Sequence, residues 1–194
     1  MEVLTEGSTA RVIAADGAGA DGAAPFATAE LADFELAPPA AVSVPEAEAA
    51  AERYLWRGHD HPFPGCFVCG PGRSPGDGLR LFPGSVGDRG VAAVWRPDAS
   101  LPHESGAIRP EIMWAALDCP SFFGALGNGS ATPAMALLGR IRAVVHARPR
   151  IGQTLVVQGW GLGVEGRKIR AASAVRNPDG EVLAAAITTW ITLR

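Results

Sequence analysis

Residues 110–126, PEIMWAALDCPSFFGAL, form the strongest helical stretch of the chain. Pro110 suits the first turn of a helix, because the N–H that it lacks has no partner at that position anyway. Apolar side chains such as Ile112, Trp114 and Leu117 fall on nearly every side of the predicted helix. A helix with almost no polar face is expected to be buried. The stretch therefore predicts one buried helix that other elements surround.

Strands are predicted on both sides of this helix. Two short ones before it cover residues 79–82 and 91–95, around a glycine-rich turn at 84–90. Three or four long ones follow it, at roughly 134–146, 153–164, 167–176 and 182–193. The turns between them are short, and the segment 177–180 (NPDG) is a strong turn sequence, so consecutive strands should pair antiparallel. This order predicts an α+β fold, a long central helix wrapped by an antiparallel sheet.

The N-terminal part of the chain has a different pattern. Residues 1–14 alternate well enough for one strand, residues 16–25 read as a loose turn, and residues 26–36 read as a returning strand. Residues 46–56 have the alanine and glutamate bias of a short helix, with Pro45 in its first turn. We therefore expect a hairpin extension followed by a short helix.

A segment rich in glycine, proline, histidine and cysteine separates this part from the main domain. It shows no periodicity, so we expect no regular structure in it. Irregular segments of this length are often functional, and we expect this one to form a lid or wall over a ligand pocket. The predicted organisation is residues 1–56 as hairpin and short helix, 57–77 as the irregular segment and 78–194 as the main domain.

Composition excludes several classes of protein. Of 194 residues, 47% are hydrophobic and 19% are charged, with a net charge of −3, so a core can form but no basic surface for nucleic acid is expected. No apolar run approaches the roughly 20 residues of a membrane helix. The N-terminus lacks the basic and apolar regions of a secretory signal, and three cysteines are too few for a disulfide framework. We expect a cytoplasmic protein that binds neither nucleic acid nor membrane.

The second half of the chain carries a family resemblance. The stretch 140–190, RIRAVVHARPRIGQTLVVQGWGLGVEGRKIRAASAVRNPDGEVLAAAITTW, is similar to hotdog-fold thioesterases of the phenylacetyl-CoA-thioesterase-like branch. The shared features are a strand leading into a P…G turn, a GR turn and an n-x-dG turn. The resemblance covers about residues 78–194. It implies the hotdog fold, an acyl-CoA substrate or ligand, no cofactor, and assembly as a homodimer or a dimer of dimers.

The resemblance also implies a catalytic group. In this family the central helix carries a carboxylate about two turns in, and Asp118 takes that position. The family's helix usually begins with a His-Gly-Gly type sequence, which Arg109, Pro110 and Glu111 replace here. The leading hypothesis is therefore hydrolysis of a small to medium acyl-CoA, with Asp118 as base or nucleophile. Because Pro110 lacks the N–H that could polarise a thioester carbonyl, a non-catalytic acyl-CoA or lipid-binding protein is the alternative.

A hydratase of the same fold ranks below both hypotheses. It would call for an aspartate and a histidine five residues apart on the helix, and the fifth residue after Asp118 is Phe123.

Other residues are weaker candidates. Glu111 lies two turns before Asp118 and is either an alternative base or a glutamate favoured by the helix dipole. His103, in the loop before the helix, is either a general acid or an ordinary exposed histidine. Arg167 and Lys168 are candidate contacts for CoA phosphates, or else solvated turn charges. The complete set of candidate substrate contacts is Arg109, Trp114, Ser121, Phe122, Arg167 and Lys168.

The cysteines allow further interpretations. Cys66 and Cys69 follow His59 and His61, and zinc accepts thiolate and imidazole ligands. A single CxxC pair is a weak signal, however, and the resemblance offers no metal, so we predict none. In that case the two cysteines tuck under the loop and the two histidines are solvated. A redox thiol pair, and Cys119 as a nucleophile, are further alternatives, although an apolar environment raises the pKa of a thiol.

Overall fold

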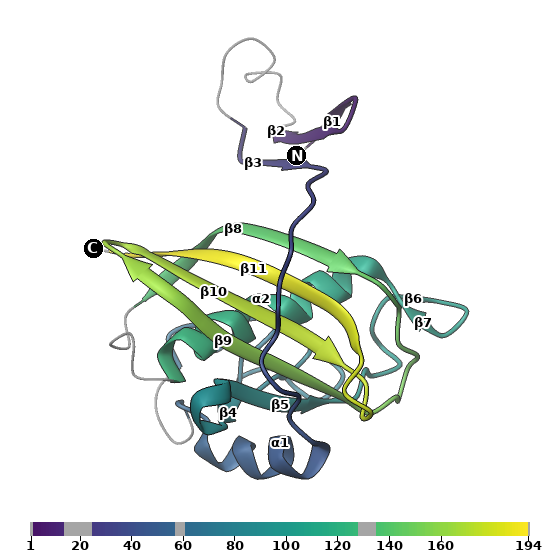
Figure 1. The fold of residues 1–194 in the computed structure, drawn as a ribbon. Helices are drawn as coiled ribbons and strands as arrows, with labels where there is room; N and C mark the ends of the chain where they lie inside the picture. Colours follow the sequence, from purple (N-terminus) through teal and green to yellow (C-terminus); the bar gives the residue numbers. More distant parts are fainter. Residues whose placement is uncertain (1, 14–24, 57–60, 128–134, 194) are drawn as a thin grey trace. The chain divides into compact units, whose positions relative to one another are not determined.

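The computed structural model describes residues 2–13, 25–56, 61–127 and 135–193. The chain forms two compact units, residues 1–35 and residues 36–194 (Figure 1). Each unit is described by itself.

The smaller unit is a three-stranded antiparallel sheet in the order β1-β2-β3. Its strands are β1 (Glu2–Glu6), β2 (Thr9–Ile13) and β3 (Ala27–Glu30). The prediction of a single strand over residues 1–14 was wrong, because the chain reverses at Gly7. This residue has a φ of +59°, a left-handed conformation that glycine adopts without steric cost. The returning strand is also shorter than the predicted 26–36.

The larger unit holds the predicted α+β architecture. Its helices and strands are α1 (Val44–Ala50), β4 (Gly84–Ser85), β5 (Val91–Trp95), β6 (His103–Glu104), β7 (Ala107–Ile108), α2 (Pro110–Gly127), β8 (Ala136–Val145), β9 (Leu155–Glu165), β10 (Lys168–Arg176) and β11 (Val182–Thr192). Six strands form one antiparallel sheet in the order β4-β5-β9-β10-β11-β8. The long helix and the four long strands predicted after it are confirmed.

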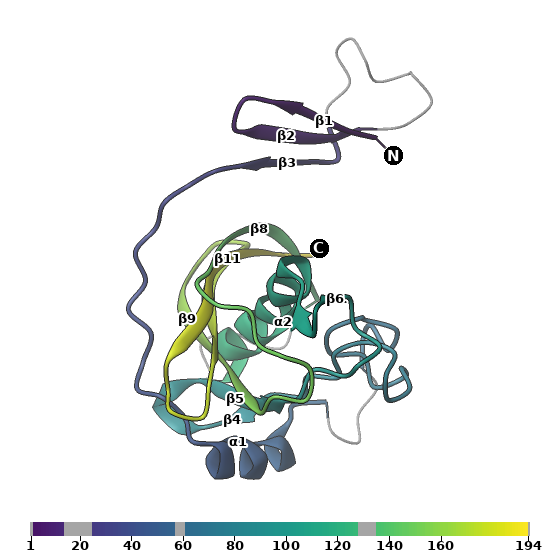
Figure 2. The ribbon, with the colours of Figure 1, turned by 90° about the vertical axis from the view of Figure 1, so that its right-hand side faces the viewer.

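Helix α2 lies against the concave face of this sheet, which curls around it (Figure 2). Side chains alternate between the faces of a strand, so Leu155, Val157 and Gly159 of β9 share one face. The first two pack with Met113 and Leu117 of α2 in the main core. At Gly159 the helix comes so close that an added Cβ atom would lie 1.8 Å from the carbonyl oxygen of Pro120. The position of α2 therefore depends on glycine at the crossing.

The opposite face of the sheet is covered by α1 and the chain that leads into it. Ser43 and Glu46 form a capping box at the start of α1, and Ala47 packs against Val156 of β9. The preceding segment crosses the outer face of the sheet (Figure 1), where Gln158 Nε2 donates to the carbonyl oxygen of Ala40 at 3.2 Å. Residues 36–56 thus belong to the larger unit.

One expectation about local structure was wrong. Residues 79–82 form no strand, because Arg80 has a φ of +52°, outside the extended region. The N–H groups of Leu79 and Leu81 donate instead to the carbonyl oxygens of Phe67 and Val68, at 2.8 Å each. The reversal predicted at 84–90 is present, and this stretch also holds the short strand β4 and a 3₁₀ turn.

Helix α2 is not buried on every side. Trp114 is 39% exposed, whereas its neighbours Met113 and Leu117 are fully buried. The side of α2 near its N-terminus that carries Trp114 therefore faces away from the sheet, which an apolar sequence alone does not reveal. None of the described helices is both long and apolar enough to span a membrane.

Candidate functional site

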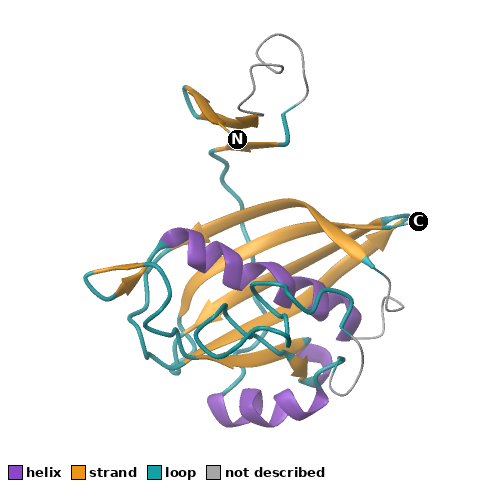
Figure 3. Cartoon of the chain, turned by 180° about the vertical axis from the view of Figure 1, so that it is seen from behind, coloured by secondary structure: helices purple, strands orange, loops and turns teal. Residues whose placement is uncertain are grey.

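A pocket of about 700 Å³ lies beside the C-terminal half of α2 in the larger unit. One wall is the irregular segment, which runs alongside α2 on the side away from the sheet (Figure 3). The described part of that segment has no helix or strand, as predicted. The pocket is lined by Trp56, His61–Cys66, Cys69, Asp118, Cys119, Phe122, Phe123, Met135–Leu138 and Trp190. Most of these side chains are apolar, so the pocket suits an apolar ligand.

Asp118 is the carboxylate that lines this pocket. Its Oδ1 atom is buried and has no hydrogen-bond partner among the described residues. Burial raises the pKa of Asp118 to about 7, and negative charge at Cys66 acts in the same direction. A buried carboxylate oxygen without a partner is costly, so its place in a pocket indicates a ligand or a water as partner.

Phe122 is the one predicted substrate contact that lines the pocket. Its ring lies against that of Trp190, with 5.0 Å between ring centroids, and the pair forms an apolar wall.

Ser121 does not line the pocket, although it lies one residue earlier. Its Oγ donates to the backbone oxygen of Asp118 at 2.7 Å and accepts from Thr188 Oγ1 at 2.8 Å and Trp190 Nε1 at 3.0 Å. One donor and two acceptor positions are all that a hydroxyl offers. Ser121 is fully buried, and its described hydrogen bonds tie α2 to β11.

The remaining candidates near the start of α2 lie outside the pocket. Arg109 and Glu111 are exposed and form an ion pair, with Nε and Oε1 2.6 Å apart. His103 is exposed on β6, in the small hairpin that β6 makes with β7. Trp114 does not line the pocket either. The structure therefore does not bring Glu111 or His103 together with Asp118.

Arg167 and Lys168 lie at the β9–β10 turn, where both side chains are exposed. Arg167 Nε donates to the carbonyl oxygen of Thr192 at 3.0 Å, and the next residue, Leu193, donates its N–H to Met135 at 2.8 Å. Because Met135 lines the pocket, this turn lies at the same end of the sheet as one pocket wall.

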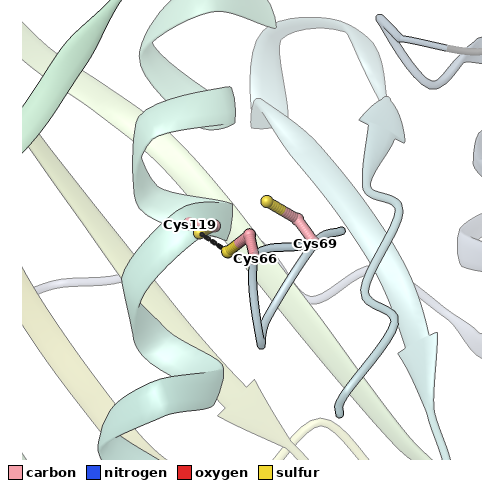
Figure 4. A group of neighbouring side chains, drawn as sticks. All are labelled: Cys66, Cys69 and Cys119. Atoms are coloured by element: carbon pink, nitrogen blue, oxygen red, sulfur yellow. Dashed lines mark hydrogen bonds between the residues drawn. The ribbon is translucent and has the colours of Figure 1, made fainter. Parts of the chain in front are cut away.

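The three cysteines all line the pocket and come together, although Cys119 is fifty residues away from Cys69 (Figure 4). Their sulfur atoms all lie within 4.8 Å of one another, and those of Cys66 and Cys119 are 3.7 Å apart. The hydrogen bond to Cys119 lowers the pKa of Cys66 and raises that of Cys119. His61 is only 8% exposed, so the expectation that it is solvated was wrong; His59 lies outside the described residues.

Sequence reasoning missed the wall that the start of β8 contributes. Residues 135–138 and Trp190 are ordinary apolar strand residues, and nothing in their local pattern marks them as a pocket lining. Sequence reasoning also missed that Cys119 lies beside the CxxC pair, because no local pattern links residues fifty positions apart.

Comparison with known proteins supports the fold. No protein-family model and no curated protein sequence matches this chain. Among solved structures, the thioesterase superfamily protein RHA08564 superposes with a TM-score of 0.51 at 17% identity, over 60% of this chain and 63% of that one. The Bacillus halodurans protein BH2602, crystallised with CoA, gives 0.50 at 14% identity over 60% and 76%. The chain has the hotdog fold.

A third structural match is Cj0977, a sigma28-regulated virulence protein from Campylobacter jejuni. It gives a TM-score of 0.50 at 10% identity, over 66% of this chain and 92% of that one. At these identities the likeness concerns the fold, and this chain spans less than two thirds of the length of RHA08564. The phenylacetyl-CoA-thioesterase-like branch stays a prediction.

Proposed function

We propose that this protein hydrolyses the thioester bond of a small to medium acyl-CoA, with the acyl chain in the pocket beside α2. The observation that carries this proposal is Asp118, which lines a largely apolar pocket of about 700 Å³ and whose buried Oδ1 has no partner among the described residues. An apolar pocket with a single carboxylate suits an uncharged acyl group next to a reacting carbonyl. The CoA held by the hotdog protein BH2602 supports the same ligand class.

In the proposed reaction the Asp118 carboxylate acts as general base. It accepts a proton from a water molecule, whose oxygen attacks the thioester carbonyl carbon. The carbon–sulfur bond then breaks, and the departing CoA thiolate takes up the proton. The products are a carboxylic acid and free CoA, so atoms and charges balance without a cofactor.

The CoA phosphates need cations outside this apolar pocket. Arg167 and Lys168 are exposed at the end of the sheet where the pocket-lining Met135 lies. A guanidinium fork matches phosphate oxygens, and an ammonium group supplies a point charge. We propose that Arg167 and Lys168 at this turn bind the CoA phosphates, and that Arg109 is a further candidate cation outside the pocket lining.

A homodimer is part of the proposal. Strand β8 is ten residues long, lies at the edge of the six-stranded sheet and pairs only with β11 among the described residues. A long edge strand with unpaired backbone groups is a ready site for pairing with a second copy. Light scattering on the purified protein checks this: a monomer at micromolar concentration would exclude it.

One observation favours the non-catalytic alternative. At the start of α2, the N–H groups of Ile112 and Met113 both donate to the carbonyl oxygen of Arg109, at 3.1 and 3.4 Å, and Pro110 has no N–H. Fewer backbone donors therefore remain at this helix end for a developing oxyanion. A protein with this arrangement could bind acyl-CoA without turning it over.

The test is thiol release from a panel of acyl-CoA esters, measured on wild type, Asp118→Asn and Asp179→Asn. Asp179 lies in an exposed turn and is not among the pocket-lining residues, so its variant controls for the loss of one carboxylate. We expect turnover by wild type and by Asp179→Asn, and at least a hundredfold lower kcat in Asp118→Asn, the scale of a lost general base. Equal activity of wild type and Asp118→Asn would show that Asp118 is not the general base. If the protein binds acyl-CoA but hydrolyses none of the esters, it is the non-catalytic acyl-CoA-binding protein of the alternative.

A further inference from the structure

Three cysteine side chains converge at one point from two distant segments of the chain. Cys66 and Cys69 come from the irregular segment, and Cys119 comes from the middle of α2 (Figure 4). The proposed hydrolysis uses none of these thiols. Three thiols in mutual contact, all reached by one pocket, therefore need an explanation of their own.

The distance between the sulfur atoms of Cys66 and Cys119 fits a tetrahedral metal, and Cys69 lies close to both. Zinc–sulfur bonds of about 2.3 Å at tetrahedral angles place two sulfur atoms about 3.8 Å apart. The sulfur atoms of Cys66 and Cys119 are 3.7 Å apart, and all three lie within 4.8 Å of one another. A disulfide requires about 2.05 Å between two sulfur atoms, and it would leave the third cysteine without a role.

The backbone around the CxxC pair is shaped to present both sulfur atoms. The N–H of Gly70 donates to the carbonyl oxygen of Cys66 at 2.9 Å, which closes a tight turn across the pair. A Cβ atom at Gly70 would lie 2.4 Å from the backbone oxygen of Pro64 and 2.5 Å from that of Cys66, so only glycine fits. Between the cysteines, the carbonyl oxygens of Phe67 and Val68 are also held by backbone hydrogen bonds. The turn is thus fixed before any ligand binds.

His61 supports the cluster as a hydrogen-bond donor. Its Nδ1 accepts the N–H of Phe63 at 3.0 Å, so the neutral ring carries its proton on Nε2. That Nε2 lies 3.5 Å from the sulfur of Cys69, where it can donate to a thiolate. Hydrogen bonds from such outer groups orient metal ligands and tune their basicity.

Two buried polar atoms near the cluster have no hydrogen-bond partner among the described residues. They are the hydroxyl oxygen of Tyr54, a side chain only 7% exposed, and Oδ1 of Asp118. Tyr54 packs in the same apolar cluster as Cys69, and Asp118 directly precedes Cys119. A water molecule bound to a metal ion held by the three sulfur atoms would offer a partner to such groups.

We propose that Cys66, Cys69 and Cys119 bind a zinc ion as three thiolates, with a water molecule in the fourth position facing the pocket. Zinc is favoured because three soft sulfur ligands in a tetrahedral arrangement suit it better than oxygen-preferring cations. On binding, the three thiols release their protons to solvent and no electron is transferred. The ion ties the irregular segment to α2, and so holds one wall of the pocket in place.

The first test is elemental analysis of the full-length protein, purified without chelator. We expect about one zinc per chain, and a thiol titration of the native protein that reveals three thiols only after the metal is removed. Replacing zinc by Co²⁺ should give the near-ultraviolet charge-transfer band of thiolate ligands with the visible spectrum of a tetrahedral ion. These measurements use wild-type protein, so they do not depend on any variant folding.

Variants then assign the ligands. Cys66→Ala, Cys69→Ala and Cys119→Ala should each lose stoichiometric zinc, whereas His61→Ala should retain it with about 10–100-fold weaker affinity, the usual effect of losing an outer-shell partner. Loss of zinc from His61→Ala equal to that in the cysteine variants would overturn the three-thiolate assignment.

Two results on wild type would overturn the metal site itself. One is three free thiols with no zinc bound after incubation with Zn²⁺, and the other is a single free thiol, which would indicate a disulfide. Metal content is measured without any acyl-CoA, so a protein that binds zinc but hydrolyses nothing would refute the proposed function alone.

Discussion

The crossing of α2 over β9 permits a sharp test of how the helix, and the pocket beside it, are positioned. We consider the substitution Gly159→Ala. The added methyl carbon would lie 1.8 Å from the carbonyl oxygen of Pro120 and 2.5 Å from its carbonyl carbon. Both are backbone atoms, so no side-chain rotation relieves the clash.

The expected cost follows from the distance that must open. Ordinary van der Waals contact begins at 3.4 Å, so helix and strand must separate locally by about 1.6 Å. A gap of about 0.5–1 Å already forfeits a quarter to a half of the dispersion attraction between packed atoms. We therefore expect a loss at the upper end of the overpacking range, about 3 kcal/mol or more in the free energy of unfolding. For a protein of this size that lowers Tm by about 6–12 °C.

Urea denaturation and thermal melting, followed by circular dichroism, measure this loss. The matched control is Gly65→Ala, because an added Cβ at Gly65 would meet nothing within 4 Å and its φ is not in the left-handed region. We expect the control to stay within about 0.5 kcal/mol of wild type. A loss below about 1 kcal/mol in Gly159→Ala would show that α2 does not rest on β9 as closely as described.

Three further predictions concern the core, the surface and the pocket. Ser121→Ala removes a buried hydroxyl that makes three hydrogen bonds, so we expect a loss of about 1–3 kcal/mol in urea denaturation; a loss under 0.5 kcal/mol would contradict the network. The hydrogen bond from Arg89 lowers the pKa of Glu46 from 4.5 to about 2, so its stabilisation is complete above pH 4.5 and is lost as the pH falls towards 2. Glu46→Gln should therefore destabilise the protein more at pH 7 than at pH 3, and equal losses at both pH values would disprove this. Leu137→Lys places a charge on a half-exposed pocket wall and should weaken acyl-CoA binding at least tenfold by titration calorimetry, whereas Leu162→Lys, an exposed strand leucine outside the pocket lining, should not; equal effects would argue against the pocket as the acyl site.

Local patterns were sufficient for the main architecture. The helix at 110–127 and the four strands after it follow from apolar spacing and from turn sequences such as 177–180, because these signals act between residues close in sequence. The same locality explains the errors. Arg80 adopts a left-handed φ in an apolar stretch that alternates like a strand, and Gly7 reverses a chain that otherwise reads as one strand.

At the candidate site, too, sequence reasoning pointed to some of the pocket-lining residues and missed others. Asp118 was found through its place in the resemblance, and the structure puts its carboxylate in the pocket. Ser121, three residues further along α2, turned out to bond Thr188 and Trp190 within the core, since its side chain points from α2 towards β11. Which of two residues one helical turn apart faces a pocket depends on what packs against each, and the sequence does not state that.

The chain by itself thus determined its long helix and the sequence order of its long strands, because these depend on periodicity and turn chemistry over a few residues, while the family resemblance pointed to the carboxylate of Asp118. Only the tertiary structure decided that Cys119 lies beside Cys66 and Cys69, and that the start of β8 closes the pocket. These contacts join segments that are about fifty or more residues apart in sequence, and they depend on how α2 packs on the sheet. The packing of α2 on the sheet depends in turn on Gly159, where the lack of a side chain lets α2 and β9 come into contact.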